Sequence, residues 1–238
     1  MMENFKAGCT YGMKRRYYRL VVAGCKIWSM VFVLALLAGC TPLLYSVDMK
    51  YVPTRTFSKT PGVAGPIVVT VAAFQDRRKI EDKMLIGRVI KADGKRIPVL
   101  PKYVKPSNAV TAPVKEFFRL AGYRVATESP AWDLQESGIN KEWGAILVGG
   151  SIDELDITCQ DSLTITKYTA KVKLTIYFAD TLKGKIFHKV TTESSVSLDH
   201  ILFSEERMEQ QLNAALSDAV EKMFEGRGVA NIINGIGG

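Results

Sequence analysis

Three carboxylate residues, Asp153, Glu154 and Asp156, lie close together in a segment whose pattern predicts a β-strand. Closely spaced carboxylates can act in general acid–base catalysis, and they can bind calcium when a loop wraps them around the ion. No glycine-containing loop of about twelve residues, as a calcium site of the EF-hand kind requires, surrounds this group. Solvated charges on a strand are the commoner arrangement. We therefore predict neither a catalytic nor a metal site here, and a hydrolase using Asp153 or Glu154 ranks last among the functions considered.

The histidines and the remaining thiol lack the neighbours that catalysis or metal binding needs. Neither His188 nor His200 has a cysteine or carboxylate at a metal-ligand spacing such as HExxH. Cys159 follows a strand-like run with no histidine near it in the sequence, which favours a buried, unreactive thiol. The serine after Gly149-Gly150 lacks the nucleophile-elbow pattern, and no glycine-rich phosphate loop occurs after residue 40. The sequence predicts a protein that is not an enzyme and holds no cofactor.

Another group of residues with possible chemistry lies near the amino terminus. Basic residues between positions 14 and 26 precede an apolar run over residues 27–37, and small residues then lead to a cysteine. This order of charge, apolar residues and small residues is typical of an export signal. The last four residues, Leu37, Ala38, Gly39 and Cys40, resemble the lipobox of bacterial lipoproteins. That resemblance implies that residues 1–39 are a cleaved signal peptide and that Cys40 carries the lipid.

Two other interpretations of this region fit less well. A membrane-spanning helix needs about 20 apolar residues, whereas the stretch from residue 27 to residue 39 has only 13. Residues 22–25 also have lipobox spacing, but the polar and aromatic residues before them supply no apolar run. Because the region before the apolar run is long for a leader, we expect translation to start at Met13.

Charge and length limit what the rest of the chain can do. The 238-residue sequence has a net charge of +8, but residues 1–39 hold six basic residues and one acidic residue, so residues 40–238 carry only +3. A balance so close to neutral gives no reason to expect nucleic-acid binding. The 199 residues from Cys40 onward are enough for one domain with a substantial core.

Composition divides the predicted mature chain into three parts. Residues 40–66 contain four prolines and two glycines, which is typical of an extended tether, although Tyr45, Tyr51 and Phe57 could dock part of it. Residues 67–226 contain the periodic patterns of a single folded domain. Residues 227–238 are glycine-rich, and we predict a flexible tail.

The first half of the domain begins with a strand and a hairpin. The β-branched run over residues 67–74 is apolar on both faces, which predicts a central strand covered on both sides. Apolar runs on either side of Asp93-Gly94 predict a hairpin. Its second arm should lie at an edge of the sheet, or outside it, because Pro98 has no N–H to donate.

A helix and a short strand complete this half. Apolar residues at helical spacing predict an amphipathic helix over residues 110–121, capped by Ser107 or Thr111 and ended by Gly122. Residues 123–126 should then form a strand that pairs in parallel with the strand over residues 67–74.

The second half predicts longer elements. A strand is expected over residues 145–157, and strict alternation over residues 168–178 and 186–198 predicts a long antiparallel hairpin with one wet face. Ser204 is placed to cap a last amphipathic helix that ends near Gly226. The expected fold class is therefore α+β, with a mixed sheet of about five strands, including the long hairpin, packed against two amphipathic helices.

The order of these elements resembles the YajG-like bacterial outer-membrane lipoproteins over roughly residues 37–225. The resemblance is carried by LAGC at 37–40, IVVTVAAFQDRR at 67–78, Ile86-Gly87, LAGYRV at 120–125, the long hairpin and ALSDAVEKM at 215–223. It implies an outer-membrane lipoprotein that faces the periplasm and has no established enzymatic activity. Thr41 after the lipidated cysteine resembles the signal that permits release to the outer membrane.

The expected function is therefore non-catalytic. We expect a domain held to the membrane by the lipid on Cys40 that binds or positions an unidentified envelope protein. The alternative is an auxiliary lipoprotein subunit of an envelope transport or assembly complex, which docks through the long hairpin. Five lysines line that hairpin: Lys171, Lys173, Lys183, Lys185 and Lys189. They could meet lipid headgroups or an acidic partner, or they could simply protect an exposed strand.

Overall fold

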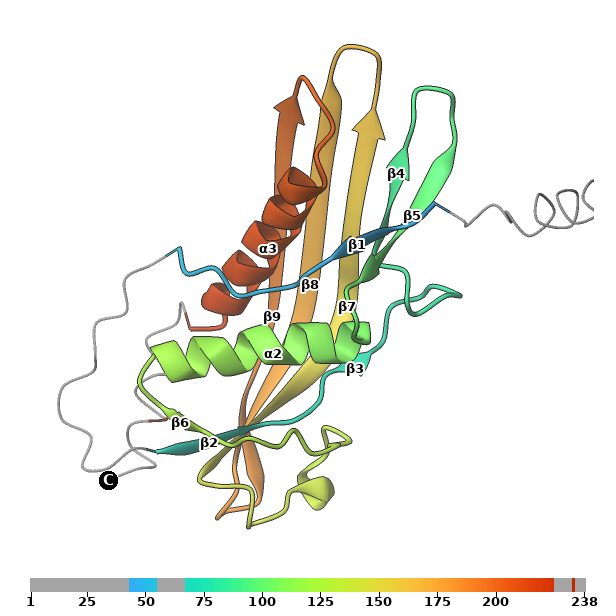
Figure 1. Ribbon diagram of the computed structural model, residues 1–238. Helices are drawn as coiled ribbons and strands as arrows, with labels where there is room; N and C mark the ends of the chain where they lie inside the picture. Colours follow the sequence, from blue (N-terminus) through green and yellow to red (C-terminus); the bar gives the residue numbers. More distant parts are fainter. Residues whose placement is uncertain (1–42, 55–66, 225–232, 234–238) are drawn as a thin grey trace, which may run out of the picture. The chain divides into compact units, whose positions relative to one another are not determined.

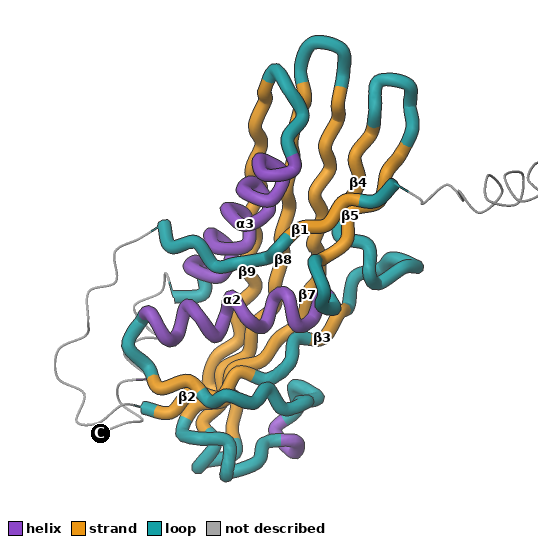
Figure 2. The backbone as a smooth tube through the Cα atoms, in the orientation of Figure 1, coloured by secondary structure: helices purple, strands orange, loops and turns teal. Residues whose placement is uncertain are grey.

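The computed structural model describes residues 43–54, 67–224 and 233, which form a tall curved sheet with two helices on one face (Figure 1; Figure 2). The α+β class and the mixed sheet that the sequence predicts are confirmed. The predicted signal peptide, the lipobox residues Leu37, Ala38 and Gly39, Cys40, Phe57 and all but Ile233 of the predicted tail lie outside the described residues.

The sheet has nine strands in the described part of the chain, more than the five or so expected. The strands are β1 (Tyr45–Val47), β2 (Val68–Val71), β3 (Gln75–Asp76), β4 (Gly87–Ile90), β5 (Arg96–Pro101), β6 (Arg124–Val125), β7 (Ile146–Asp161), β8 (Thr166–Asp180) and β9 (Lys185–His200). The helices are α2 (Pro106–Leu120), the 3-10 turn η1 (Glu136–Gly138) and α3 (Glu205–Lys222). The strands that the sequence analysis does not predict are β1 and β3, whose three and two residues are too few to leave a periodic signal.

Strand β7 organises the sheet because it has neighbours along its whole length. On one edge it pairs antiparallel with β8, and β8 pairs antiparallel with β9, which forms the predicted long hairpin. On the other edge β2 and β3 pair in parallel with its first half, and β4 pairs in parallel with its second half. The predicted parallel pairing of β2 with β6 is confirmed.

The main core lies between the sheet and the two helices. Alternate residues of β8 from Tyr168 to Phe178 are fully buried on this face, as the alternation predicts. Helix α3 covers them with an apolar stripe, and Ser204 caps it by accepting a hydrogen bond from the Arg207 N–H. A smaller apolar cluster around Trp132 and Leu147 covers the opposite face of the sheet near β2, so this strand is buried on both sides.

The predicted boundary between tether and domain is wrong, because the fold begins well before residue 67. Residues Tyr45–Val47 form β1, which pairs in parallel with β5, and the side chains of Met49 and Tyr51 are buried. The docking of Tyr45 and Tyr51 that the sequence left open therefore occurs. Ile233, in the predicted flexible tail, is also buried in the main core.

Pro98 does not mark an edge strand. Strand β5 lies between β4 and β1, and β1 is the edge. The missing N–H is tolerated because the pairing of β1 with β5 begins at Val99, one residue beyond the proline. The turn of this hairpin is as predicted, since Gly94 has a φ of +82°.

The predicted cap of the first helix is also wrong. Helix α2 begins earlier than expected, after Lys105, which makes no side-chain cap hydrogen bond. Pro106 in the first turn has no N–H that needs a partner. Thr111 lies inside the helix, where its Oγ1 accepts from the Phe74 N–H at 3.0 Å and donates to the Ser107 carbonyl at 2.7 Å. Gly122 ends the helix with a φ of +94°, as predicted.

One polar side chain on the core face of β9 offers a test of the packing. Thr192 lies opposite Leu174, is buried, and its Oγ1 has no hydrogen-bond partner among the described residues. Because a buried hydroxyl without a partner costs its desolvation energy, Thr192→Val should raise the free energy of unfolding by about 1 kcal/mol. Urea denaturation measures this. Thr191→Val is the control, because Thr191 is exposed and its hydroxyl bonds Thr175; equal gains in both variants would contradict the assignment.

Candidate functional site

The first described residue after the predicted lipid site is Leu43, three residues beyond Cys40. From β1 onward the chain runs extended between α3 and α2 as far as Thr54 (Figure 1). We call residues 48–54 the strap. Strand β1 and the strap are the first described part of the chain after Cys40, so their attachment to the rest of the domain is the first feature of the candidate site.

The strap is attached to α3 by a regular series of hydrogen bonds. The backbone N–H groups of Asp48, Lys50, Val52 and Thr54 donate to side-chain oxygens of Glu209, Asn213, Ser217 and Glu221, at 3.0, 2.9, 2.8 and 2.8 Å. Two residues of extended chain rise about 6.6 Å, and four residues of α-helix rise about 6.0 Å. The two repeats match closely enough for every second strap residue to meet every fourth helix residue.

Two of the helix residues make further bonds to the strap. The Asn213 amide donates from Nδ2 to the Asp48 carbonyl at 3.0 Å. The buried carboxylate of Glu221 accepts from the Tyr51 hydroxyl at 2.9 Å and from the Thr54 hydroxyl. The strap is therefore fixed on both its backbone and its side chains.

Sequence reasoning missed this attachment, although a signal was present. The four partners stand at spacings of four residues beside the apolar stripe of α3, and their types are those that accept hydrogen bonds from N–H groups. When such a row of polar side chains borders the apolar face of a helix, it indicates that another segment with hydrogen-bond donors lies beside the helix.

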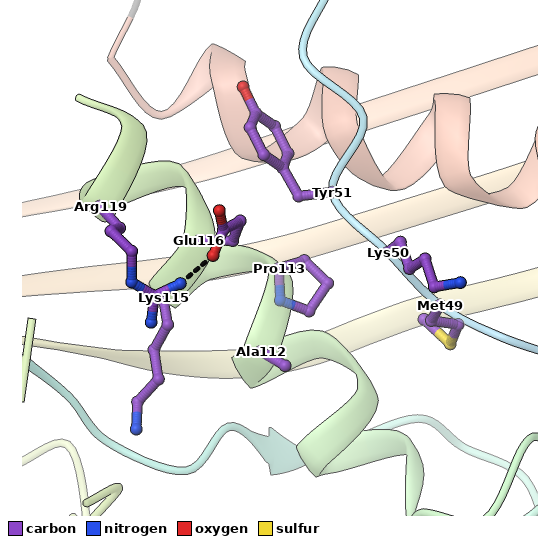
Figure 3. A pocket seen from close by; sticks show the side chains of 8 residues that line it. All are labelled: Met49, Lys50, Tyr51, Ala112, Pro113, Lys115, Glu116 and Arg119. Atoms are coloured by element: carbon purple, nitrogen blue, oxygen red, sulfur yellow. Dashed lines mark hydrogen bonds and ion pairs between the residues drawn. The ribbon is translucent and has the colours of Figure 1, made fainter. Parts of the chain in front are cut away.

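A cleft separates the strap from α2 (Figure 3). It has a volume of about 420 Å³, and its walls are Met49, Lys50 and Tyr51 on the strap and Ala112, Pro113, Lys115, Glu116 and Arg119 on α2. Both walls contribute apolar side chains, and both also contribute long charged side chains. The cleft is large enough to receive one or two side chains of another protein.

The cations of the cleft are engaged with other groups of the domain. Lys50 forms an ion pair with Asp48 at 2.7 Å, and Arg119 pairs with Glu116 (Figure 3). Lys115 donates to the carbonyls of Thr127 and Glu128 at 2.7 and 3.1 Å, and burial, with a smaller contribution from Arg119, lowers its pKa. This paired arrangement is better suited to a mixed polar and apolar peptide than to a phosphate group.

The carboxylates at Asp153, Glu154 and Asp156 lie on the solvent side of β7 rather than in a shared site. Asp153 occupies a bulge in the β7–β8 ladder and accepts hydrogen bonds from the hydroxyls of Ser151 and Thr175 at 2.8 and 2.5 Å. Asp156 accepts from Thr158, and its register partner on β8 is Lys171. These contacts explain the carboxylates as partners within the sheet, and they give no geometry for acid–base catalysis.

The remaining candidates for chemistry are also placed by packing. Cys159 is fully buried, and burial raises its pKa to about 12, as expected for an unreactive thiol. The centres of the His188 and Phe178 rings are 5.8 Å apart, and His200 Nδ1 lies 3.1 Å from the Leu202 carbonyl oxygen. No group of three or more potential metal ligands occurs in the described ranges.

The lysines of the long hairpin do not form one continuous basic surface. Lys173 pairs with Glu193 at 3.2 Å, Lys183 pairs with Asp180 at 3.2 Å, and Lys189 lies 5.0 Å from the centre of the Tyr177 ring. The positive charge of the hairpin is thus partly compensated along its length. This favours the interpretation that these lysines protect and solubilise exposed strands.

A second hollow, of about 570 Å³, lies on the opposite face of the sheet beside Trp132. Its lining includes Phe74, Gln75 and Asp133, and the Gln75 amide donates to the Trp132 carbonyl at 2.8 Å. The Trp132 indole donates to the Gln135 carbonyl, so the ring is fixed in place. The hollow contains no arrangement of nucleophile, base and oxyanion donors.

Solved structures of other proteins are similar to this chain in fold, although their sequences are only about a tenth identical. A DUF330-family protein from Xanthomonas campestris is 11% identical, with a TM-score of 0.48 over 81% of this chain and 96% of that one. A homologue of the neuraminyllactose-binding hemagglutinin from Helicobacter pylori is 10% identical, with a TM-score of 0.43 over 80% and 100%. Lipoprotein GNA1162 from Neisseria meningitidis is 10% identical, with a TM-score of 0.38 over 68% and 100%.

No protein-family model and no curated protein matches the chain. The resemblance to the YajG-like lipoproteins therefore remains a prediction. At TM-scores below 0.5, the similar structures carry no argument about ligand or activity. Within the described ranges, no helix is long and apolar enough to cross a membrane.

Acid should weaken the domain through three buried or half-buried carboxylates. Burial alone would raise the pKa of Asp76, but hydrogen bonds and charge from Arg78 outweigh it and the pKa is lowered. Burial alone would also raise the pKa of Asp180, but the hydrogen bonds and charge of Lys183 outweigh it and the pKa is lowered. The pKa of Asp161 is lowered chiefly by the hydrogen bond from Lys91.

Because these pKa values are lowered by folding, their stabilising effect is present above the unfolded value of about 4 and is lost as the pH falls below it. We expect the free energy of unfolding to be steady from neutral pH to about pH 5 and then to decrease. Urea unfolding at a series of pH values measures this. Asp76→Asn should reduce the slope on the acid side, and a stability that rises on acidification would contradict the prediction.

Proposed function

We propose that the protein is a lipid-anchored envelope protein of the outer membrane, facing the periplasm, whose domain binds or positions another envelope component without catalysing a reaction. The observation that carries this proposal is the sequence LAGC at residues 37–40, directly after an apolar run and a basic region. Strand β1 begins five residues after Cys40, so a lipid at Cys40 would be separated from the folded domain by a short stretch of chain.

This connection is short because β1 pairs with β5 and the strap after it is bonded to α3 at four places. A lipid on Cys40 would therefore be joined to the domain through only the few residues before β1. The domain would therefore be held close to the bilayer rather than at the end of the long tether that the composition predicts.

The anchor is tested by mass spectrometry of the mature protein purified from membranes, together with incorporation of labelled palmitate. We expect a chain that begins at Cys40 and carries acyl groups. Cys40→Ser should abolish labelling and processing. Cys25→Ser is the matched control, because its surroundings have lipobox spacing but lack an apolar run. Normal processing and location of Cys40→Ser would refute the proposal.

The binding role is tested by crosslinking in cells from the cleft between the strap and α2. A photoreactive residue at Glu116 should capture the partner, because this side chain lines the cleft. The control places the same residue at Leu182, an exposed position in the β8–β9 turn. A domain that yields no crosslinked protein from either position would argue against a binding function.

A second candidate is an auxiliary subunit of an envelope transport or assembly complex, docked through the hairpin. The favouring observation is that β9, sixteen residues long, pairs with β8 alone among the described strands. A free strand edge can add a strand from a partner. Deleting residues 183–185 and finding the complex still assembled would remove this version.

A further inference from the structure

One end of the molecule gathers three turns that are far apart in the sequence. Strand β4 runs parallel to β7, with Ile90 opposite Gln160, so the β4–β5 turn lies beside the β7–β8 turn. Strand β8 begins at Thr166 opposite His200, the last residue of β9, so the β9–α3 loop lies there too. All three are at the upper end of Figure 1.

Two of these turns expose large apolar side chains. The exposed fraction is 94% for Leu163, 47% for Ile165, 74% for Ile201 and 71% for Leu202. We call these four residues the apolar tip. Because Thr166 and His200 are register partners, the two pairs of apolar residues extend from neighbouring strands. Single exposed apolar residues need no explanation, but a group of four at one end indicates a surface that something covers.

The exposure of these side chains is built into the backbone. In the β9–α3 loop, the Tyr168 hydroxyl accepts from the Ser204 N–H at 2.7 Å and donates to the Leu202 carbonyl at 3.3 Å. In the β7–β8 turn, the Ser162 N–H donates to the Ile165 carbonyl at 3.1 Å. Since both turns are held by these bonds, the apolar side chains are presented outward.

The direction of β1 relates this end to the predicted lipid. Because β1 is parallel to β5, with Tyr45 opposite Val99, the chain before Tyr45 comes from the side of the β4–β5 turn. Leu43 and Leu44 are about half exposed there. Cys40 is three residues before Leu43, and three extended residues span at most about 11 Å.

Aromatic and basic groups lie behind and beside the tip. The Phe203 ring lies 5.1 Å from the Tyr45 ring and 6.3 Å from the Tyr168 ring, and Lys91 Nζ lies 4.4 Å from the centre of Phe203. The exposed charged residues around the turns are of both signs: Lys95, Arg96 and Lys167, together with Asp93, Asp199, Glu205 and Glu206. Exposed apolar side chains in front of aromatic rings, with long charged side chains around them, are the arrangement that suits a membrane–water interface.

We propose that the apolar tip inserts into the boundary between headgroups and acyl chains of the bilayer that holds the Cys40 lipid. This inference rests on the proposed lipid anchor and adds an orientation to it. The lipid and the tip would form two points of attachment, with the long hairpin standing away from the membrane. The β8–β9 turn would then be the part farthest from the bilayer.

The test compares a fluorescent label at the tip with one at the opposite end. Leu163 and Leu182 are exposed leucines in the turns at the two ends of β8, so replacing either with cysteine does not threaten the core. They are separated by the 15 residues of β8, or about 50 Å at the usual rise of a strand. Cys159 is buried with a raised pKa and should not be labelled.

Each labelled, full-length mature protein is reconstituted into vesicles of phosphatidylethanolamine and phosphatidylglycerol that contain lipids with a nitroxide near the headgroup. We expect loss of fluorescence from the label at residue 163 and unchanged fluorescence from the label at residue 182. A label at Ile201→Cys should behave like the one at residue 163. Circular dichroism confirms that each variant is folded.

Equal quenching at residues 163 and 182, or no quenching at residue 163, would overturn the inference. A label at residue 163 that is shielded from water but not quenched by the lipids would also overturn it, because another protein or a second copy would then cover the tip. Mass spectrometry of the same samples separates the two proposals. Acylated Cys40 without quenching at the tip refutes only the orientation, whereas a chain without acyl groups refutes both.

Discussion

Replacing Leu216 with aspartate is expected to leave the domain unfolded at room temperature. Leu216 lies on the buried stripe of α3 and is fully excluded from solvent. The change removes about 2 kcal/mol of apolar burial. It also forces a carboxylate into the hydrophobic core, at a cost of several kcal/mol even after a change in its pKa. Single domains have a free energy of unfolding of about 5–15 kcal/mol. The combined loss therefore removes most or all of this stability.

Circular dichroism and thermal unfolding measure this effect. The matched control is Gln210→Asp, at an exposed position on the same helix, which should change the stability by less than about 0.5 kcal/mol. A cooperative transition of Leu216→Asp at the wild-type temperature would show that α3 does not pack on the sheet as described.

Replacing Arg78 with methionine should produce the next largest loss. The Arg78 side chain is 3% exposed and pairs with Asp76 through two nitrogens, from Nε to Oδ1 at 2.9 Å and from Nη2 to Oδ2 at 2.6 Å. Its guanidinium also donates to the carbonyls of Leu85, Lys83 and Leu155 at 2.7, 2.7 and 3.3 Å. One side chain thus joins the segment after β3 to the segment before β4 and to β7.

Removing one partner of a buried ion pair typically costs about 3–5 kcal/mol, because the other charge and the carbonyls lose their partners. We expect Arg78→Met to lower the free energy of unfolding by an amount in this range. Arg77→Met is the control, since Arg77 is exposed and, among the described residues, its side chain bonds only Gln75. Similar losses for both variants would mean that the network around Arg78 contributes little.

The sequence predicts the elements that have a long periodic pattern. The alternation in β8 and the stripe and cap of α3 each extend over a dozen residues or more, and a single burial environment governs each of them. The predicted parallel pairing of β2 with β6 also holds, because a strand–helix–strand unit has few alternatives.

What the sequence could not predict depends on contacts between distant segments. The proline-rich composition of residues 40–66 indicates a tether, and nothing local to the strap shows that α3 offers it four acceptors. Pro98 likewise predicts an edge strand, because nothing near it in the sequence shows that β1, from much earlier in the chain, pairs with β5. Arg78 is one of two adjacent arginines, and only the fold decides which of them is buried.

The bonds between the strap and α3 join residues that are 161 to 170 positions apart. Contacts of such long range form late, since folding slows as the sequence separation of native contacts grows. The amino-terminal strap cannot settle before the carboxy-terminal helix has been synthesised. The contacts that complete the domain therefore also delay its completion until the end of synthesis. In a chain that is exported as proposed, this delay would favour passage through a secretion channel before folding is complete.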